Sequence, residues 1–408
     1  MSPYDFSIQK KIPNALGRAG VLATPHGSIE TPAFVVVGTK ASVKALSPEQ
    51  VASLGAEVVL ANTYHLYLEP GDERVKKAGG LHSFMNWQGP TMTDSGGFQA
   101  FSLGAAFGTN VSKIAKGDTD EARVNNEENG EEVALAKIDE DGVTFRSHLD
   151  GSEHRFTPER SIEIQHNIGA DMIFAFDECT SPHAPRAYQE EAMARTHRWA
   201  KRCLDFHLVV EPLSEKKQAL FGIVQGGRFR DLREESAKII SQMKSGDRGF
   251  DGFGIGGSFD KEDMNTAVGW VNALLPEDKP RHLLGIGEPS DLFGGIENGI
   301  DLFDCVAPTR MARNGTLYTH DGRLNIMKAQ FREDFSPIEK ECGCYTCAHY
   351  TRAYVAHLFR AKEMFAATLA SIHNLYFIVN LVKKIRQNIL NETFAEYKKN
   401  FLQRYYAA

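Results

Sequence analysis

Eight short apolar runs within the first 309 residues constrain the fold most, because none of them alternates with polar residues. Continuous apolar runs of this length are typical of strands that are buried on both faces. Each run is closed by Gly, Asn, Asp or Gln, which favour turns. The runs occupy residues 32–39, 56–63, 90–97, 170–178, 220–227, 252–257, 282–287 and 302–309.

Helix signals lie between several of these runs. Residues 47–55 begin with Ser, a common helix cap, and end with Gly. Residues 157–169 begin with Thr followed by Pro, and their apolar residues recur at helical spacing. Together the runs and helices predict an α/β fold, a (β/α)8 TIM barrel within residues 1–320. A doubly wound open sheet is the alternative, but its phosphate-binding G-x-G-x-x-G is absent after the first strands.

Three features of the chain bear on where the protein works. The N-terminal sequence MSPYDFSIQKK has no apolar segment after its charges, so no export signal is predicted. Six cysteines in 408 residues are too few for a disulfide scaffold. No run of about 18 apolar residues occurs, so no membrane-spanning segment is expected. These features predict a cytoplasmic protein with no membrane partner.

The net charge of −7 is distributed unevenly along the chain. Residues 118–141 hold ten acidic and two basic residues, so an insertion at about 112–142 is expected to be a solvated loop. Residues 328–408 hold twelve Lys or Arg and seven Asp or Glu. This basic C-terminal region is compatible with a nucleic-acid partner, and a solvated helix face is the alternative interpretation.

Three aspartates lie at the ends of predicted barrel strands: Asp94, Asp177 and Asp304. A buried carboxylate is costly unless it is paired or takes part in chemistry. A single one would be explained as a helix cap, whereas three at the same end of one barrel favour carboxylate chemistry. In retaining glycosyl transfer, one carboxylate attacks an anomeric carbon and another moves a proton at the leaving group. A (β/α)8 glycosidase acting on sugars and an enzyme acting on a ribose–base bond both fit this pattern.

The sequence ECGCYTCAHY contains a cysteine cluster with metal-ligand spacing. Cys342, Cys344 and Cys347 follow the pattern C-x-C-x-x-C, and tetrahedral zinc needs a fourth ligand. His373, in an apolar helical stretch, and the nearby His349 are the two candidates. Four protein ligands would close the coordination sphere, so the predicted zinc is structural and stabilises a helix-rich C-terminal subdomain at 321–408.

Motifs along nearly the whole chain resemble those of the bacterial type of tRNA-guanine transglycosylase, the queuine tRNA-ribosyltransferase family. In order they are TDSGGFQ, SHLDGS, TPERSIEIQHNIGAD, FDEC, GIVQGG, GFGIGG, HLLGIG, DLFDCVAPTRMARNG, CGCYTC and SIHNL. The resemblance implies an enzyme that exchanges guanine at the wobble position of a GUN anticodon for a 7-deazaguanine. In this family the exchange passes through a covalent enzyme–tRNA intermediate, and the enzyme is typically a homodimer.

The resemblance also implies a role for each matching residue. Asp304 is expected to be the nucleophile and Asp94 the general acid/base, while His373 completes the zinc site. Arg310 and Arg313 are expected to contact RNA beside the anticodon. Two glycines would let backbone groups approach the base closely, and polar and stacking side chains would bind its edge and faces. The expected base-binding residues are Ser95, Phe98, Asp177, Gln225, Gly256, Gly257 and Leu284.

The chain departs from the family pattern at residues 258–262, which read SFDKE where bacterial members usually have a sequence like LAVGE. In the family this strip lies near the 7-substituent of the incoming base. The two candidate bases are 7-aminomethyl-7-deazaguanine and queuine. The polar Asp260 and Lys261 favour queuine, which carries hydroxyl groups, although Asp260 also suits a cationic aminomethyl group.

Two further alternatives are related proteins with other roles. An archaeal-type transglycosylase would act elsewhere in tRNA and usually carries additional C-terminal RNA-binding domains. A non-catalytic partner subunit would tend to lose the catalytic carboxylates, whereas Asp94 and Asp304 are both present.

Overall fold

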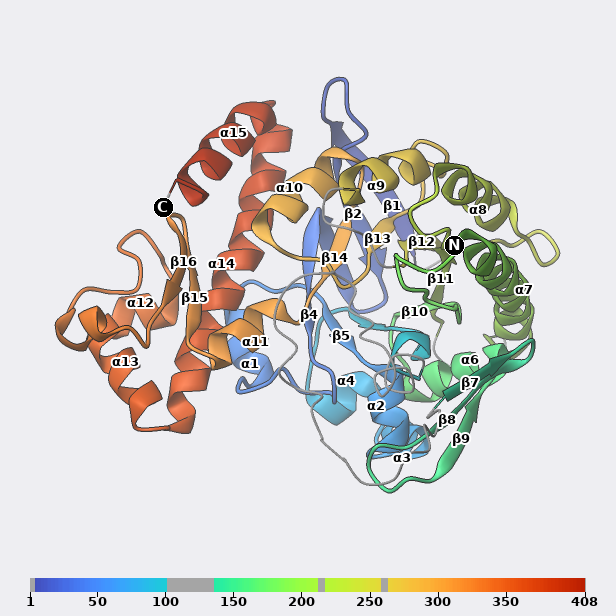
Figure 1. The fold of residues 1–408 in the computed structure, drawn as a ribbon, viewed down its shortest axis with the longest axis horizontal. Helices are drawn as coiled ribbons and strands as arrows, with labels where there is room; N and C mark the ends of the chain where they lie inside the picture. Colours follow the sequence, from blue (N-terminus) through green and yellow to red (C-terminus); the bar gives the residue numbers. More distant parts are fainter. Residues whose placement is uncertain (1–3, 101–135, 212–216, 258–262, 408) are drawn as a thin grey trace. The chain divides into compact units, whose positions relative to one another are not determined.

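The computed structural model describes residues 4–100, 136–211, 217–257 and 263–407. Eight parallel strands form a closed barrel, which confirms the predicted fold class (Figure 1). Each strand lies within a predicted apolar run or begins one residue before it. In barrel order the strands are β4 (Ala33–Val37), β5 (Val59–Ala61), β6 (Thr91–Thr93), β10 (Met172–Phe174), β11 (Ala219–Val224), β12 (Gly252–Ile255), β13 (Arg281–Leu283) and β14 (Leu302–Asp304).

Helices follow the barrel strands, as the (β/α)8 pattern requires. The helices of this region that lie wholly within the described residues are α1 (Pro48–Ser53), α2 (Thr63–Leu68), α3 (Asp72–Lys77), α4 (Leu81–Met85), α6 (Pro158–Ile168), α7 (Arg186–Val210), α8 (Arg230–Gln242), α9 (Met264–Asn272), α10 (Pro289–Glu297) and α11 (Ala307–Arg313).

Both helices predicted from their end signals, α1 and α6, are present. Ser47 Oγ accepts the Gln50 N–H at 3.2 Å, and Gln50 Oε1 accepts the Ser47 N–H at 2.9 Å. This reciprocal pair is a capping box, which satisfies two otherwise unpaired backbone donors. Thr157 caps α6 through the Arg160 N–H, and Gly169 ends the helix with a left-handed φ of 72°.

Three small antiparallel sheets were not predicted from the sequence. In β1 exposed and half-buried residues alternate, so no apolar run marks that strand, and the apolar residues of β2 were overlooked. The sheets are β1 (Asp5–Lys11), β2 (Arg18–Thr24) and β3 (Gly27–Thr31); β7 (Ala136–Asp139), β8 (Gly142–Arg146) and β9 (Glu153–Phe156); and the hairpin β15 (Thr316–Thr319) and β16 (Gly322–Asn325).

Most of the predicted acidic insertion at 112–142 lies outside the described residues. Residues 136–142 form β7 and the turn into β8, so at this end the segment is a strand and a turn and not a loop, although its acidic side chains are exposed to solvent as expected. Its acidic side chains pair with arginines of β9 and α7, which ties the small sheet to that helix. The ion pairs are Asp139–Arg155 at 2.7 Å, Glu140–Arg198 at 2.6 Å and Asp141–Arg202 at 3.4 Å.

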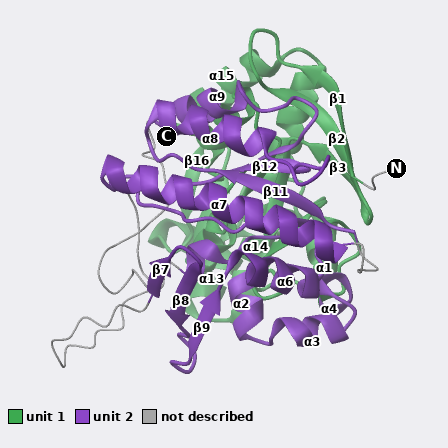
Figure 2. Cartoon of the chain, turned by 90° about the vertical axis from the view of Figure 1, so that its right-hand side faces the viewer, with its two compact units in different colours: residues 1–61, 85–91, 283–408 green, residues 62–84, 92–282 purple. Residues whose placement is uncertain are grey.

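The chain forms two compact units (Figure 2). The first comprises residues 1–61, 85–91 and 283–408, and the second comprises residues 62–84 and 92–282. The first unit therefore holds β4, β5, β14 and the C-terminal helices. The second holds β6, β10, β11 and β12 with α6, α7, α8 and α9.

The C-terminal region is rich in helices, as predicted, and is built around the long helix α14 (Met364–Leu390), which packs against α11 and β15 (Figure 1). By length and composition α14 is apolar enough to cross a membrane, but 72% of its most apolar window is buried inside the protein. Its apolar side chains therefore belong to the core of the first unit. The other C-terminal elements are the 3₁₀ helix η2 (Ala329–Glu333), α12 (Tyr345–His349), α13 (Arg352–Arg360) and α15 (Phe394–Tyr405).

Candidate active site and metal centre

Asp94 follows β6 directly, and donors from the segment after β5 hold its carboxylate. The Thr63 N–H donates to Asp94 Oδ1 at 2.9 Å and the Gly96 N–H donates to the same atom at 3.2 Å. The Asn62 side-chain amide donates to Asp94 Oδ2, while Asn62 Oδ1 caps α2 by accepting the His65 N–H. Three donors hold the carboxylate in one orientation, which a group that transfers protons requires.

Ser95, Asp177 and Gln225 form a buried, hydrogen-bonded row in the second unit. Gln225 Nε2 donates to Asp177 Oδ2 at 2.6 Å, and Ser95 Oγ donates to Asp177 Oδ1 at 3.2 Å. The amide oxygen of Gln225 has no hydrogen-bond partner among the described residues. The row therefore offers carboxylate and amide oxygens as acceptors, which suits a flat ligand edge that carries N–H donors.

Gly256 and Gly257 follow β12, and their surroundings give a reason for glycine at both positions. A Cβ added at Gly256 would lie 2.7 Å from Gln225 Nε2. A Cβ added at Gly257 would lie 2.9 Å from Gln225 Oε1 and 2.8 Å from Arg233 Nη2. Gly257 also has a φ of 94°, which side chains disfavour. Within the described residues, the close approach that these glycines permit is therefore to Gln225, Ile223 and Arg233.

Asp304 is the last residue of β14 and lies opposite Val35 of β4 in the barrel. The Gly285 N–H donates to Asp304 Oδ1 at 2.9 Å, and Gly285 adopts a φ of 74° in the turn that directs this donor. Loss of water contact raises the pKa of the adjacent Cys305 thiol to about 12. The thiol therefore stays protonated at neutral pH, and the carboxylate is the stronger candidate nucleophile of the two.

Four further predicted site residues lie after β6, after β13 or on α11. Phe98 is half-buried in the helical turn after Asp94, and Leu284 is half-buried directly after β13. Arg310 is exposed and Arg313 is half-buried on α11, the helix that follows Asp304. The strip at 258–262, with Asp260 and Lys261, lies outside the described residues.

The residues that support the candidate site were missed in the sequence analysis. A signal was present for Asn62 and Thr63, because these polar residues close the apolar run at 56–63 in the same way that Asp94 closes the next run. The contribution of Gly285 is a backbone N–H, which no side-chain pattern reveals. Arg233 lies in a helix with many charged residues, so nothing marked it as buried.

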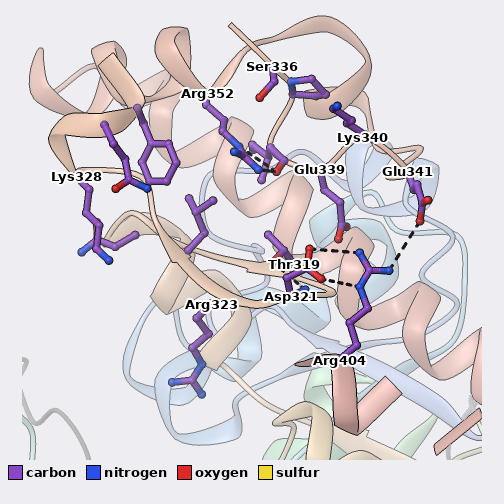
Figure 3. A pocket seen from close by; sticks show the side chains of 16 residues that line it. Thr319, Asp321, Arg323, Lys328, Ser336, Glu339, Lys340, Glu341, Arg352 and Arg404 are labelled. Carbon is purple, nitrogen blue, oxygen red and sulfur yellow. Dashed lines mark hydrogen bonds and ion pairs between the residues drawn. The ribbon is translucent and has the colours of Figure 1, made fainter. Parts of the chain in front are cut away.

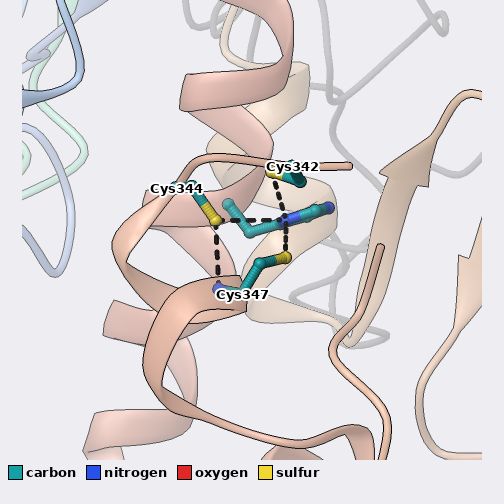
Figure 4. A group of neighbouring side chains, drawn as sticks. Cys342, Cys344 and Cys347 are labelled. Atoms are coloured by element: carbon teal, nitrogen blue, oxygen red, sulfur yellow. Dashed lines mark hydrogen bonds between the residues drawn. The ribbon is translucent and has the colours of Figure 1, made fainter. Parts of the chain in front are cut away.

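Cys342, Cys344, Cys347 and His373 form the predicted metal-ligand cluster (Figure 4). The sulfur atoms of the three cysteines lie close to His373 Nδ1. The distances are 3.8 Å for Cys342, 3.5 Å for Cys344 and 3.4 Å for Cys347. Tetrahedral zinc with bonds of about 2.3 Å to sulfur and about 2.05 Å to nitrogen separates these two ligand atoms by about 3.6 Å. The donor set and its spacing therefore fit a zinc ion.

The second ring nitrogen of His373 sets its tautomer. His373 Nε2 donates to the Tyr318 carbonyl at 2.7 Å, so Nδ1 of the neutral ring has no proton and faces the thiols. His373 is fully buried, whereas the rival candidate His349 is exposed and outside the cluster. A hydrogen bond between the first two thiols holds the pKa of Cys342 well below its ordinary value and raises that of Cys344. The cluster thus favours one thiolate, the form that binds metal.

Asn374 ties this cluster to α11. Its side-chain amide donates to the carbonyls of Pro308 and Thr316, both at 3.0 Å, and its Oδ1 accepts the Tyr318 N–H at 3.0 Å. Tyr318 is therefore bonded through its N–H to Asn374 and through its carbonyl to His373. Two adjacent residues of α14 thus connect the metal site, β15 and α11.

A separate pocket of about 500 Å³ lies in the C-terminal region (Figure 3). Its lining comes from β15, β16, η2 and the segment at 336–341, together with Arg352 and Arg404. Arg404 pairs there with Asp321 at 2.6 Å and with Glu341 at 4.0 Å. None of the lining residues belongs to the predicted catalytic, base-binding or metal-binding sets.

Known proteins resemble this chain over its whole length. A family model described as queuine tRNA-ribosyltransferase matches residues 14–407. The queuine tRNA-ribosyltransferase of Caldanaerobacter subterraneus subsp. tengcongensis is 46% identical over 409 residues, which cover 100% of this chain and 99% of the relative. The queuine tRNA-ribosyltransferase of Fusobacterium nucleatum is 45% identical, and the match covers 99% of this chain and 98% of the relative. The queuine tRNA-ribosyltransferase of Streptococcus sanguinis is 44% identical, and the match covers 99% of this chain and 97% of the relative.

Proposed function

This chain belongs to the queuine tRNA-ribosyltransferase family and is a tRNA-guanine transglycosylase, and we propose that Asp304 and Asp94 carry out different steps of its reaction. An oxygen of Asp304 bonds to ribose C1′ as the bond from C1′ to guanine N9 breaks, and the departing guanine takes a proton from Asp94. The incoming base then loses a proton to Asp94 while its nitrogen attacks C1′ and releases Asp304. Asp94 ends each cycle in its starting protonation state.

The observation that carries this proposal is the placement of the two aspartates. Asp94 and Asp304 each end a barrel strand, and backbone N–H groups hold each carboxylate. In (β/α)8 enzymes the C-terminal ends of the strands carry the catalytic residues. The direct test is uptake of radiolabelled guanine into tRNA, and uptake that survives loss of both carboxylates would contradict the proposal.

We assign recognition of the base edge to Ser95, Asp177 and Gln225. The Asp177 carboxylate and the Gln225 amide oxygen accept the N1–H and the exocyclic amine of guanine, and a 7-deazaguanine presents the same edge. Phe98 and Leu284 cover the two faces of the ring. The hydrogen bonds within the row fix which oxygens face the ligand, because Gln225 Nε2 is already committed to Asp177.

We place the tRNA, read at a GUN anticodon, against α11 and residues 321–408. Arg310 and Arg313 offer planar guanidinium groups next to the nucleophile, and such groups suit phosphate and guanine edges. Lys328 and Lys340 line the pocket of Figure 3, and neither forms an ion pair within the described parts of the chain. These two ammonium groups are available to backbone phosphates.

The predicted basic face of the last two helices contributes less to this surface. Several of its bases are paired with acidic residues of the protein itself, which reduces the charge that it offers to phosphates. The pairs are Lys383–Glu57 at 3.2 Å, Lys398–Glu297 at 2.6 Å and Arg404–Asp321 at 2.6 Å.

We propose that the Cys3His cluster binds one structural zinc ion. Four protein ligands fill a tetrahedral sphere, so no position is left for substrate or water. The bound ion would link the segment at 342–347 to α14 through His373.

We propose a homodimer formed through an aromatic patch beside the metal cluster. Four large apolar side chains of this patch are exposed: Tyr345 at 50%, Tyr354 at 40%, Met364 at 88% and Phe365 at 38%. Tyr350 stacks on Tyr354 with ring centroids 5.2 Å apart and meets the edge of Phe365 at 5.8 Å. Contiguous exposed apolar side chains of this kind mark protein interfaces.

Replacing Tyr354 by glutamate is expected to convert the dimer to a monomer at micromolar concentration, because it puts a charge at the centre of the patch. Sedimentation velocity measures the change. Tyr406→Glu is the matched control, since Tyr406 is an aromatic residue exposed to 57% at the end of α15, outside the patch. A wild-type protein that sediments as a monomer, or a Tyr354→Glu variant that stays dimeric, would contradict this interface.

The incoming base is proposed to be queuine, on the sequence of the strip at 258–262. A site built for the hydroxyls of queuine should reject a base that lacks them by about tenfold or more, because its polar groups are left unpaired. Incorporation of each free base into tRNA with a wobble guanine, compared by kcat/KM, measures the preference. The double variant Asp260→Val and Lys261→Gly, which restores the usual bacterial residues, should shift the preference to the aminomethyl base. Preference of the wild type for the aminomethyl base, with no queuine incorporated, defeats the idea.

A further inference from the structure

We propose that Arg233 is a positioning residue that holds the base-reading segments after β11 and β12 in register. Arg233 lies on α8, which packs beside β11 (Figure 1). Its side chain is 0% exposed, and arginine is almost never fully buried without a partner for its charge and donors. The proposal rests on the base-reading role of Gln225 and Asp177 given above.

The guanidinium of Arg233 donates to three backbone carbonyls that surround the reading residues. Arg233 Nε donates to the Gly227 carbonyl at 2.7 Å. Its Nη1 donates to the Gly256 carbonyl at 2.8 Å and to the Val224 carbonyl at 3.2 Å. Val224 is the last residue of β11, and the next residue is Gln225. One side chain thus anchors the backbone on both sides of Gln225 and the backbone after β12.

These bonds continue the ladder between β11 and β12 beyond its last strand pair. Val224 lies opposite Ile255, and the Gly256 N–H donates to the Val224 carbonyl at 3.0 Å. Arg233 then bonds both that carbonyl and the Gly256 carbonyl, where no further strand residues pair. The backbone at 224–227 and at 256–257 is therefore held at a fixed separation by the guanidinium.

The position of Gly257 shows how closely this arrangement is packed. A Cβ added at Gly257 would lie 2.8 Å from Arg233 Nη2 and 2.9 Å from Gln225 Oε1. Burial lowers the pKa of Arg233 to about 10, so the group stays protonated at neutral pH and keeps its donors. Gln225 is thus fixed through its own hydrogen bond to Asp177 and through the backbone that Arg233 holds.

Replacing Arg233 by glutamine is expected to raise the KM for guanine about 10- to 100-fold, since a shift of about 1 Å in a positioning group costs that much. The variant should also lose discrimination between guanine and hypoxanthine, which lacks the exocyclic amine. The KM for tRNA should change less than about twofold. The measurements are guanine exchange at varied guanine and varied tRNA concentrations, and competitive inhibition by hypoxanthine.

Arg233→Lys, which keeps the charge and one donor direction, is expected to give an intermediate KM for guanine. This variant tests the proposal if the glutamine variant does not fold.

Arg281→Gln is the matched control. Arg281 is also buried, 2% exposed, and also donates to backbone carbonyls, those of Leu275 at 2.9 Å and Pro276 at 3.4 Å. It is the first residue of β13, so it lies at the opposite end of a barrel strand from the reading residues. Its loss should lower thermal stability and leave the KM for guanine and the hypoxanthine discrimination unchanged. Equal effects of the two substitutions on these constants would overturn the proposal.

Gln225→Leu separates failure of this inference from failure of the base-reading role. If Gln225→Leu leaves the KM for guanine unchanged, the base-reading role is wrong and the inference falls with it. If Gln225→Leu raises that KM and Arg233→Gln does not, the base-reading role stands and only the positioning role of Arg233 is overturned.

Discussion

Replacing Asp304 by asparagine is expected to reduce guanine exchange at least about 1,000-fold and to abolish the covalent enzyme–tRNA adduct. The amide oxygen can still accept the Gly285 N–H, which the carboxylate accepts at 2.9 Å, so the local structure should survive. What the amide lacks is the negatively charged oxygen that is proposed to attack C1′. Asp304→Ala should lose both activities as well. Denaturing gels measure the adduct, and uptake of radiolabelled guanine measures the exchange.

Asp301→Asn is the matched control for this experiment. Asp301 immediately precedes β14, at the other end of the strand from Asp304, and accepts two hydrogen bonds from Arg18 at 2.9 and 2.7 Å in a buried ion pair. Breaking a buried pair should cost about 3–5 kcal/mol of stability. The folded control should nevertheless form the adduct. Full exchange activity in either Asp304 variant would remove the assignment of this residue as the nucleophile.

Replacing Cys344 by serine is expected to lower the bound zinc from about one equivalent per chain to a small fraction of that. The melting temperature should fall by about 10 °C or more, because the ion contributes its binding free energy to folding. The Cys344 sulfur lies 3.5 Å from His373 Nδ1 and is buried, so a hydroxyl there leaves the ion with three good ligands. Elemental analysis and thermal unfolding, with and without a chelator, measure the two effects.

Cys203→Ser distinguishes loss of metal from loss of any buried thiol. Cys203 is fully buried outside the cluster, where its thiol donates to the Pro158 carbonyl at 3.6 Å. Burial raises the pKa of this thiol well above its ordinary value, so it does not offer the thiolate that zinc requires. The control should lose some stability and keep its metal. Wild-type protein that is fully folded without metal, and that zinc does not stabilise, would rule out the structural role.

The barrel and the metal cluster were predictable because local sequence encodes them directly. Strands buried on both faces appear as continuous apolar runs, and each of the eight runs coincides with a barrel strand, two of which begin one residue before the run. Three of the four cluster residues lie within six positions, a spacing that is typical of metal sites. β1 was missed because it is partly exposed, and its residues follow no apolar run.

The contacts that support the candidate site were not predictable because they join distant parts of the chain. The sequence places Asn62, Thr63 and Asp94 at the ends of successive apolar runs, but it does not show that they bond to one another, as the structure does. Arg233 lies in the charged sequence RDLREESAK, where most arginines face water, yet its side chain is buried. Glu140, in the turn after β7, pairs with Arg198 but remains 61% exposed, so its charge is solvated as the composition predicts. Composition describes how many charges a segment carries, and tertiary structure decides which of them are buried.

The position of Tyr318 has a consequence for the metal content of the working enzyme. Its carbonyl accepts from His373 of the metal cluster and its N–H donates to Asn374, which also holds α11 and with it Arg310 and Arg313. If the proposed metal fixes α11 in the position that we propose for tRNA binding, thermodynamic linkage makes the effect reciprocal, and bound tRNA must tighten metal binding by the same factor. Enzyme engaged with tRNA would then hold its ion against a higher chelator concentration than idle enzyme does. A higher concentration of tRNA would in this way let the enzyme keep its metal at a lower concentration of free metal.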